Sequence, residues 1–268
     1  MRPTTRLREL LRQPGVVVAP GAYDCITAKI IEREGFPAVY MTGAGTSASR
    51  IGRPDVGLVT MTEMVANAHA IAESVSVPVI ADADTGYGNP VNVIRTMREY
   101  EAAGVAGVHI EDQMWPKKCG HYEGKRVIAK EEMVGKLRAA ADARQDPAFL
   151  IIARCDAIAV NGLEDALDRG HAYVEAGADV LFIEAPSADQ LPVITRTFKD
   201  VPLLYNMALS GKTPLIPFKQ VEEIGYKLVI LPGMTMALVL KQVSDLWRDV
   251  KQAGGPQPYL GRGATFAE

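Results

Sequence analysis

The stretch EAAGVAGVHI, residues 101–110, decides the fold, because a helical pattern ends at a glycine and a strand pattern follows at once. The same signal recurs in EAGADVLFI, residues 175–183. Glycine is the usual residue just past the C-terminus of a helix. Helical patterns that alternate with short buried strands in this way are typical of repeated β/α units.

Eight short apolar runs of the strand type are spread along the chain. They cover residues 15–20, 37–43, 77–84, 106–112, 149–156, 179–185, 201–206 and 226–233. These runs are β-rich without clear alternation, as expected of parallel strands buried on both faces. Helical patterns lie between them, for example at residues 25–35, 61–74, 90–104, 130–144 and 162–177. Eight such units predict an α/β protein with a (β/α)8 TIM-type barrel, and a doubly wound open sheet is the alternative.

The bulk composition limits the domain organisation and the kind of partner. The chain has 268 residues, 48% of them hydrophobic, and a net charge of -3. We expect one barrel domain over residues 1–268, including a C-terminal helical extension over about 234–268. The charge balance predicts no nucleic-acid partner. No apolar run approaches the ~18 residues of a membrane span, residues 1–15 lack a signal-peptide pattern, and three scattered cysteines predict reduced thiols in the cytoplasm.

Most of the predicted strands end in polar or charged residues. These are Thr42, Gly43, Asp82, Asp84, Glu111, Asp112, Arg154, Asp156, Glu184 and Asn206. Any one of them could be a cap or turn residue. In a barrel, however, the C-terminal strand ends converge on the face where barrel enzymes carry their active sites. Burying so many charges without a function would be costly, so we expect an active site there.

Asp82 and Asp84 are the predicted metal-binding residues. They stand two residues apart at a strand end, where side chains at i and i+2 share a face. Glu111 from the next predicted strand adds a third carboxylate. This all-oxygen set suits Mg2+, or Mn2+, and not zinc. An Asx-turn with a helix cap is the alternative, but Glu111 and Asp112 should fall beside the pair, which favours the metal.

The segment QMWPKKCGHYEGKR, residues 113–126, follows the fourth predicted strand and contains Cys119. Cys119 and His121 have no second ligand pair nearby, which argues against zinc. Neighbouring positions also rarely orient a thiol and an imidazole for acyl chemistry. A solvated basic loop is the remaining structural alternative. A thiol with a free pKa of about 8.5, tuned by the neighbouring cations Lys117, Lys118, His121 and Arg126, suits a general acid.

Three motifs together resemble the isocitrate lyase and phosphoenolpyruvate mutase superfamily. They are ADADTGYG at residues 81–88, VHIED at 108–112 and KKCGH at 117–121. The resemblance runs from about Pro20 to the end of the barrel, and KKCGH marks the carbon–carbon lyase branch. It implies a Mg2+-dependent lyase that cleaves 2-hydroxy dicarboxylates. It also implies a homotetramer, a dimer of dimers, in which the C-terminal helix is exchanged between subunits.

The resemblance also implies roles for individual residues. Asp82 and Asp84 would hold Mg2+ largely through water, Asp55 matches an active-site Asp, and Cys119, Gly120 and His121 match a gating loop. Our candidate substrate-binding residues are Thr42, Gly43, Ala44, Lys117, Gly120, Arg154, Glu184 and Asn206. Our candidate catalytic residues are Cys119, Asp55, His121, Glu111 and Tyr40. The general base stays open among Tyr40, Asp55, His109 and Glu111.

The expected chemistry is a retro-aldol type cleavage of the C2–C3 bond. A bound metal supplies Lewis-acid stabilisation of the nascent carbonyl. Arg154, with Asn206, would stabilise the charge that develops on the departing carboxylate, by about 3 kcal/mol per good donor. Cys119 then protonates C3 as general acid. The products are a 2-oxo acid such as pyruvate and a saturated carboxylic acid.

The sequence departs from the superfamily pattern in ways that bear on the substrate. Thr42 and Ala44 replace a Ser and a Gly, and near Ala237 an Arg expected of methylisocitrate lyases is missing. An alkyl-substituted malate of the 2,3-dimethylmalate type is therefore favoured, with Met234, Met236 and Leu238 suited to the alkyl group. Alternatives are a methylisocitrate lyase, if Arg262 reaches the site, an oxaloacetate hydrolase or decarboxylase, and a non-catalytic dicarboxylate-binding barrel.

Overall fold

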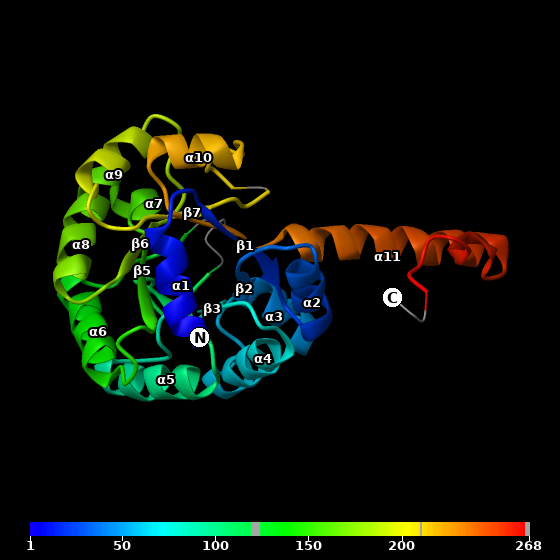
Figure 1. Ribbon diagram of the computed structural model, residues 1–268, viewed down its shortest axis with the longest axis horizontal. Helices are drawn as coiled ribbons and strands as arrows, with labels where there is room; N and C mark the ends of the chain where they lie inside the picture. The colour runs from blue at the N-terminus through cyan, green and yellow to red at the C-terminus, as the bar shows by residue number, and fades with distance from the viewer. Residues whose placement is uncertain (119–123, 210, 266–268) are drawn as a thin grey trace.

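A ring of eight parallel strands forms the centre of the molecule (Figure 1). The computed structural model describes residues 1–118, 124–209 and 211–265. The strands are β1 (Val17–Ala22), β2 (Val39–Met41), β3 (Val79–Asp82), β4 (Gly107–Glu111), β5 (Leu150–Cys155), β6 (Val180–Ile183), β7 (Leu204–Asn206) and β8 (Leu228–Leu231). Their order is β6-β5-β4-β3-β2-β1-β8-β7, and a parallel bridge between Leu181 and Leu203 brings the two ends together. The prediction of a (β/α)8 barrel with eight strands is confirmed.

Most of the helices follow a strand and pack around the ring, whereas the first covers one end of the ring and the last projects from it. They are α1 (Pro3–Arg12), α2 (Cys25–Arg33), α3 (Gly43–Ile51), α4 (Met61–Ser74), α5 (Pro90–Ala102), α6 (Lys130–Ala143), α7 (Ile158–Asn161), α8 (Leu163–Glu175), α9 (Leu191–Thr197), α10 (Phe218–Ile224) and α11 (Met234–Ala253), with a 3-10 turn η1 (Gln257–Tyr259). The five helical segments that we singled out in the sequence are all helices here. Helix α3 escaped prediction because its glycine- and serine-rich sequence is a poor helix former, although Thr42 caps its N-terminus by accepting from the Gly45 N–H at 3.3 Å.

Two apolar layers hold the barrel together, one inside the ring and one between the ring and the helices. Along β5 the two layers alternate: Leu150 and Ile152 face the inner core, whereas Ile151 and Ala153 pack in the outer one. This is the two-residue period of a strand that is buried on both faces. It explains why the strands read as continuous apolar runs in the sequence.

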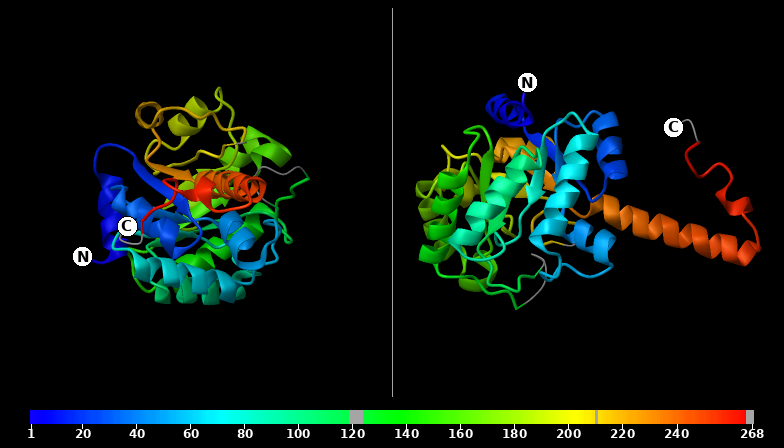
Figure 2. Two further views of the ribbon diagram at one scale, coloured as in Figure 1. Left: turned by 90° about the vertical axis from the view of Figure 1, so that its right-hand side faces the viewer. Right: turned by 90° about the horizontal axis from the view of Figure 1, so that it is seen from below.

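Helix α1 covers the N-terminal end of the barrel (Figure 2). Leu7 is fully buried and belongs to the inner core. Arg8 pairs with Asp179 at 2.9 Å, and the Thr4 hydroxyl donates to Asp146 at 2.8 Å, which ties the helix to the loops before β5 and β6. With this end covered, the opposite end, formed by the C-terminal ends of the strands, is left for a site.

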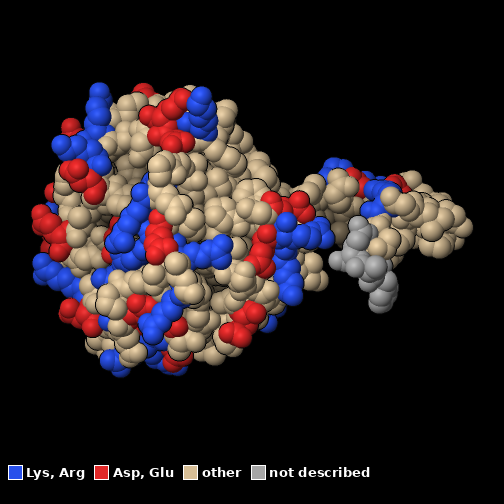
Figure 3. Space-filling model, in the orientation of Figure 1, with Lys and Arg blue, Asp and Glu red and all other residues tan. Residues whose placement is uncertain are grey.

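Helix α11 leaves the barrel and projects as an arm (Figures 1 and 2). None of its residues is buried, although it is 20 residues long. It exposes Leu238, Leu240, Val243 and Trp247, and Figure 3 shows that much of the arm's visible surface is neither acidic nor basic. Within the part of the chain that the structure describes, no helix has the length and apolarity needed to cross a membrane.

Candidate active site

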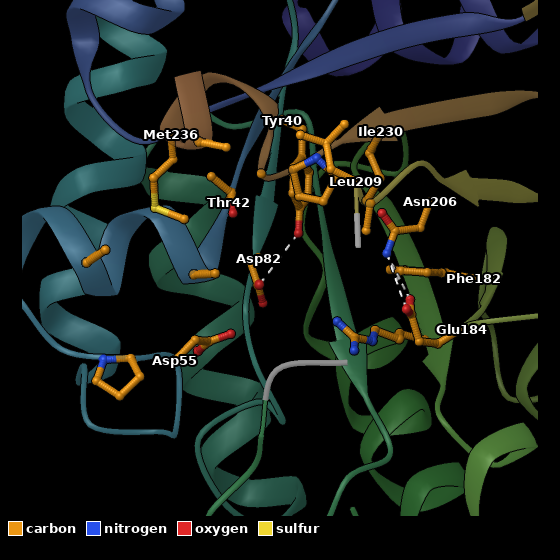
Figure 4. A pocket seen from close by; sticks show the side chains of 18 of the residues that line it. Tyr40, Thr42, Asp55, Asp82, Phe182, Glu184, Asn206, Leu209, Ile230 and Met236 are labelled. Atoms are coloured by element: carbon orange, nitrogen blue, oxygen red, sulfur yellow. Dashed lines mark hydrogen bonds between the residues drawn. The ribbon is translucent and has the colours of Figure 1, made fainter. Parts of the chain in front are cut away.

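A cavity of about 350 Å³ opens at the C-terminal ends of the strands (Figure 4). Most of its charged or polar lining comes from five strands or the residues just after them, and Arg53 and Asp55 come from the loop after α3. The lining residues are Tyr40, Thr42, Ala44, Ala48, Arg53, Pro54, Asp55, Asp82, Arg154, Phe182, Glu184, Asn206, Ala208, Leu209, Ile230, Pro232, Gly233, Met236 and Ala237. The strand ends therefore converge as the sequence predicted.

Asp82 lies at the centre of this wall and is almost fully buried. One carboxylate oxygen accepts from the Gly43 N–H at 3.2 Å, and the other accepts from the Asp84 N–H at 2.9 Å. Strand β3 ends at Asp82, and Asp84 takes a left-handed conformation with φ 48°. The expectation that Asp82 and Asp84 occupy successive positions on one strand face is therefore wrong, because the chain turns between them.

Asp84 instead points to Lys117. The Lys117 ammonium lies 2.6 Å from Asp84 and 2.5 Å from Asp55, and it is 2% exposed. It also faces Asp82 and Glu111, so four carboxylates surround a single ammonium; burial lowers the pKa of Lys117, but these acids raise it well above its usual value. Burial likewise raises the pKa of Asp84 to about 7. The cluster carries more negative charge than its lysine compensates.

This excess of buried negative charge fits a divalent cation. Burial raises the pKa of Glu111 well above its ordinary value, and Glu111 Oε1 has no hydrogen-bond partner in the described structure. The donors are all oxygens, which suits a hard cation. In the described parts of the chain, no three Asp, Glu, His or Cys side chains converge to form a ready-made cage. A cation held here would take much of its shell from water and substrate, as Mg2+ usually does.

Tyr40 is the tyrosine whose hydroxyl faces the cavity beside Asp82 (Figure 4). This hydroxyl lies 2.7 Å from His109 Nε2, and it donates weakly to Asp82 at 3.5 Å. Burial raises the pKa of Tyr40 well above 10, and burial lowers the pKa of His109 to about 4. Tyr40 is thus a phenol and His109 a neutral imidazole near pH 7.

The opposite wall carries the groups that could bind carboxylates. Arg154 is 8% exposed, lies 3.1 Å from Glu111, and stacks over the Phe182 ring at 5.1 Å from its centroid. The Asn206 amide donates to both oxygens of Glu184, at 3.0 and 3.3 Å (Figure 4). This wall therefore combines a fixed guanidinium with a hydrogen-bonded amide–carboxylate pair.

The structure brings most of the predicted site residues together. Those that line the cavity are Tyr40, Thr42, Ala44, Asp55, Asp82, Arg154, Glu184 and Asn206. Gly43, Asp84, Glu111 and Lys117 lie behind this lining, in contact with residues that form it. Cys119, Gly120 and His121 lie outside the described residues.

The apolar side of the cavity corrects one expectation and adds a residue that we missed. Met236 lines the cavity, but Met234 and Leu238 do not, and they are 42% and 60% exposed. They leave the site because α11 turns them outward. Ala237 also lines it, at the position that lacks the expected Arg. Arg53 lines the mouth and escaped notice because it lies in a loop, although its place two residues before Asp55 could have pointed to it.

A (β/α)8 barrel with a carboxylate-rich cavity at the C-terminal strand ends defines a barrel enzyme of small-molecule chemistry. A family model described as phosphoenolpyruvate phosphomutase matches residues 7–251. The chain is 51% identical to 2,3-dimethylmalate lyase of Eubacterium barkeri, covering 100% of this chain and 93% of that one. It is 46% identical to 2-methylisocitrate lyase of Aeropyrum pernix, covering 100% and 86%.

Solved structures agree with these relatives. A crystal structure of 2,3-dimethylmalate lyase aligns with a TM-score of 0.94 and 39% identity, over 99% of this chain and 89% of the other. A phosphonopyruvate hydrolase in complex with oxalate and Mg2+ aligns with a TM-score of 0.91 and 30% identity, over 100% and 93%. The chain belongs to the phosphoenolpyruvate mutase/isocitrate lyase superfamily. The prediction of a carbon–carbon lyase from this superfamily is confirmed.

Proposed function

We propose that this protein is a Mg2+-dependent lyase that cleaves a 2,3-dialkylmalate such as 2,3-dimethylmalate to pyruvate and propanoate. The observation that carries the proposal is the two-sided cavity. One side presents Asp82, Arg154 and Glu184, and the other presents the apolar Met236 and Ala237. A malate with alkyl substituents places carboxylates on the first side and alkyl carbon on the second. The relative at 51% identity, itself a 2,3-dimethylmalate lyase, supports the same substrate.

The residues of the polar wall divide the work of binding and charge stabilisation. Arg154 would hold the carboxylate attached to C3, where negative charge develops as the C2–C3 bond breaks. Asn206, with Glu184, would orient the same carboxylate. Thr42 and Ala44, at the N-terminal end of α3, would meet the C1 carboxylate, Thr42 with its hydroxyl and Ala44 with its backbone N–H. The cavity thus orients both carboxylates before the bond breaks.

Asp82 and Asp84 would hold the cation, with Mn2+ as a substitute for Mg2+. The cation supplies Lewis-acid polarisation of the C2 oxygen when it is bound. The surplus of carboxylates around Lys117 supports this assignment. Removal of divalent cations with EDTA should abolish cleavage, and added Mg2+ should restore it. Cleavage that persists after exhaustive chelation would contradict the assignment.

The candidates for the general base separate by position. Tyr40 and Asp55 line the cavity, whereas His109 and Glu111 are fully buried and do not line it. We favour Tyr40, because its hydroxyl faces the cavity beside Asp82, within reach of a bound substrate. Tyr40→Phe should lower kcat by about 10²-fold or more. A kcat close to the wild-type value would point to Asp55 instead.

Cys119 is proposed as the general acid that delivers a proton to C3, and His121, two positions along the chain, as its helper. Cys119→Ser keeps the size of the side chain but raises the pKa of the acid far above that of a thiol. We expect kcat to fall by about 10²-fold or more. A variant that cleaves at nearly the wild-type rate would remove Cys119 from the proton-transfer step. Cys25→Ser, which changes a partly buried thiol on α2 outside the cavity, is the matched control.

Methylisocitrate lyase is the second candidate, and Arg53 is the observation that favours it. Arg53 brings a cation to the cavity mouth, where it could meet a third carboxylate. Arg262, which we considered for this role, binds Asp249 on the projecting arm at 2.9 Å. The relative at 46% identity is a 2-methylisocitrate lyase. Oxaloacetate hydrolase remains the third candidate.

A pyruvate-release assay with Mg2+ separates these substrates. We expect 2,3-dimethylmalate to be cleaved with the highest kcat/KM among 2,3-dimethylmalate, 2-methylisocitrate and isocitrate. Oxaloacetate is followed separately through oxalate formation. Ala237→Arg should shift preference toward 2-methylisocitrate, because it adds a cation to the apolar wall. A wild-type preference for a tricarboxylate, lost in Arg53→Gln, would favour the second candidate instead.

We further propose that the protein is a cytoplasmic homotetramer, a dimer of dimers, with α11 packed on a second copy of the chain. A 20-residue helix gains most of its stability from packing, and this one buries no residue within its own chain. The free thiols Cys25 and Cys155 are compatible with a reducing compartment. Residues 1–268 would then form one functional unit with its C-terminal extension as the assembly element.

A further inference from the structure

Asp156 is a buried carboxylate that lies directly behind Arg154. It is 0% exposed, follows the end of β5, and does not line the cavity. Because the two residues are separated by two positions at the end of a strand, their side chains emerge on the same face. One Asp156 oxygen accepts from Arg154 Nε at 2.9 Å, and the other accepts from Nη2 at 3.1 Å.

This bidentate contact fixes the plane of the guanidinium. Paired N–H···O bonds between an arginine and a carboxylate constrain orientation as well as distance. The remaining nitrogen, Nη1, lies 3.1 Å from Glu111, and the Phe182 ring supports the flat face. Arg154 therefore reaches the cavity with its rotation already restricted.

Asp156 is itself held on its other sides. The Lys125 ammonium lies 2.8 Å from Oδ1, and the Lys125 side chain is only 4% exposed. The Asp156 N–H donates to Asp112 at 2.8 Å, and Asp112 in turn accepts from the Tyr173 hydroxyl at 2.7 Å. Burial raises the pKa of Asp156, but Arg154 and Lys125 outweigh this effect and lower it below the ordinary value. The carboxylate is thus charged at neutral pH.

We propose that Asp156 is a positioning residue that acts through Arg154: it orients the guanidinium toward the substrate carboxylate, and Lys125 holds Asp156 in place. The proposal rests on the proposed function for the identity of the substrate. The competing explanation is a buried ion pair that serves only folding. The two explanations make different predictions for a variant that lacks Arg154. A residue that positions Arg154 has no further effect on catalysis in that variant.

A double-mutant cycle between Asp156→Asn and Arg154→Gln tests this dependence. With the substrate that the wild type accepts, Asp156→Asn should lower kcat by about 10²-fold, because a small misplacement of a binding group has effects of that size. In the Arg154→Gln background the same substitution should change kcat by less than about twofold. Effects that multiply in the double variant would overturn the proposal.

A second pair of variants keeps the test decisive if Asp156→Asn fails to fold. Lys125→Gln removes the lysine that holds Asp156. Lys130→Gln is the matched control, because it removes an exposed ion pair in which the Lys130 ammonium lies 2.6 Å from Asp168. We expect Lys125→Gln to lower kcat by about tenfold, part of the effect of a misplaced binding group, and Lys130→Gln to leave it unchanged. A wild-type kcat in Lys125→Gln would overturn the proposal, because the orientation of Arg154 would then not depend on how Asp156 is held.

Binding of oxalate in the presence of Mg2+ repeats the cycle without turnover. Oxalate is a compact dicarboxylate that would meet Arg154 in the cavity. Calorimetry should show similar losses of oxalate affinity in Asp156→Asn and Arg154→Gln, with no further loss in the double variant. If the wild type binds oxalate but releases pyruvate from none of the acids assayed, the proposed function fails, while this cycle still decides the role of Asp156.

Discussion

At the residue scale, the close contact between Gly43 and Asp82 shapes the polar wall of the cavity. The backbone N–H of Gly43 donates to Asp82 at 3.2 Å, and a Cβ at position 43 would lie 2.3 Å from that same carboxylate oxygen. Glycine is therefore required here by close approach to Asp82. The sequence showed Gly43 only as part of a strand-end turn.

Gly43→Ala is expected to inactivate the enzyme, because the added methyl group pushes the Asp82 carboxylate out of place. We expect kcat/KM to fall by about 10²-fold or more, the cost typical of a misplaced catalytic group. Gly233→Ala is the matched control, since a Cβ there meets nothing within 4 Å although the residue also lines the cavity. Steady-state kinetics on both variants checks this. Equal activity of the two would show that Asp82 tolerates displacement.

At the element scale, packing stabilises the outer helices more than the intrinsic helix propensity of their residues does. Gly135 in α6 and Gly170 in α8 both stand inside helices, where glycine costs about 1 kcal/mol relative to alanine. Their surroundings differ. A Cβ at Gly135 would make an ordinary contact with Pro90 at 3.6 Å, whereas one at Gly170 would lie 2.5 Å from the Phe198 ring.

These two glycines give a matched prediction on stability. Gly135→Ala should raise the free energy of unfolding by about 0.5–1 kcal/mol, because it removes the glycine penalty at no steric cost. Gly170→Ala should lower it by about 1–3 kcal/mol, because the methyl group overpacks against Phe198. Urea denaturation measures both. The same sign of change in both variants would mean that packing at Gly170 is looser than the contact distance indicates.

At the scale of the whole molecule, the most prominent feature is the projecting helix α11. Leu240, Val243 and Trp247 lie at i, i+3 and i+7 along α11 and share one exposed face. An apolar stripe of this kind on an unsupported helix is typical of an interaction surface. It is the part of the chain that the barrel core does not explain.

Trp247→Glu is expected to weaken assembly, since it replaces the largest apolar side chain of the exposed stripe with a charge. Light scattering should show a smaller species than the wild type at equal protein concentration. Gln242→Glu adds the same charge on another face of α11 and should leave the mass unchanged. A wild-type protein that is monomeric by light scattering would contradict the proposed tetramer. A Trp247→Glu variant with wild-type mass would place the interface elsewhere.

The strand pattern could be predicted because parallel strands that are buried on both faces must be apolar at nearly every position. All eight strands follow from that rule, and a glycine marks the ends of α2, α5 and α8. Helix α1 could not be found this way. Its role depends on Leu7 entering the inner core of a barrel that forms from distant strands.

The candidate site was predictable only in part. Strand-end residues such as Asp82 and Arg154 can be recognised in the sequence, because burying a charge next to an apolar strand is energetically costly unless the charge has a function. Arg53 and Leu209 come from loops, whose paths over the barrel mouth no local pattern encodes. Met234 and Met236 look equivalent in the sequence, but only Met236 faces the cavity, because the direction of α11 separates them.

The sequence by itself determined the barrel, the superfamily and the acidic strand ends, since each depends on local patterns within about ten residues. Tertiary structure decided which acids face the cavity and which act behind it. Asp82 ends β3 and Asp156 directly follows β5, yet Asp82 lines the cavity, whereas Asp156 lies behind it and binds Arg154 and Lys125. The physical reason is that the environment of a buried charge is set by partners from other strands and loops, which only the closed barrel brings within hydrogen-bonding distance.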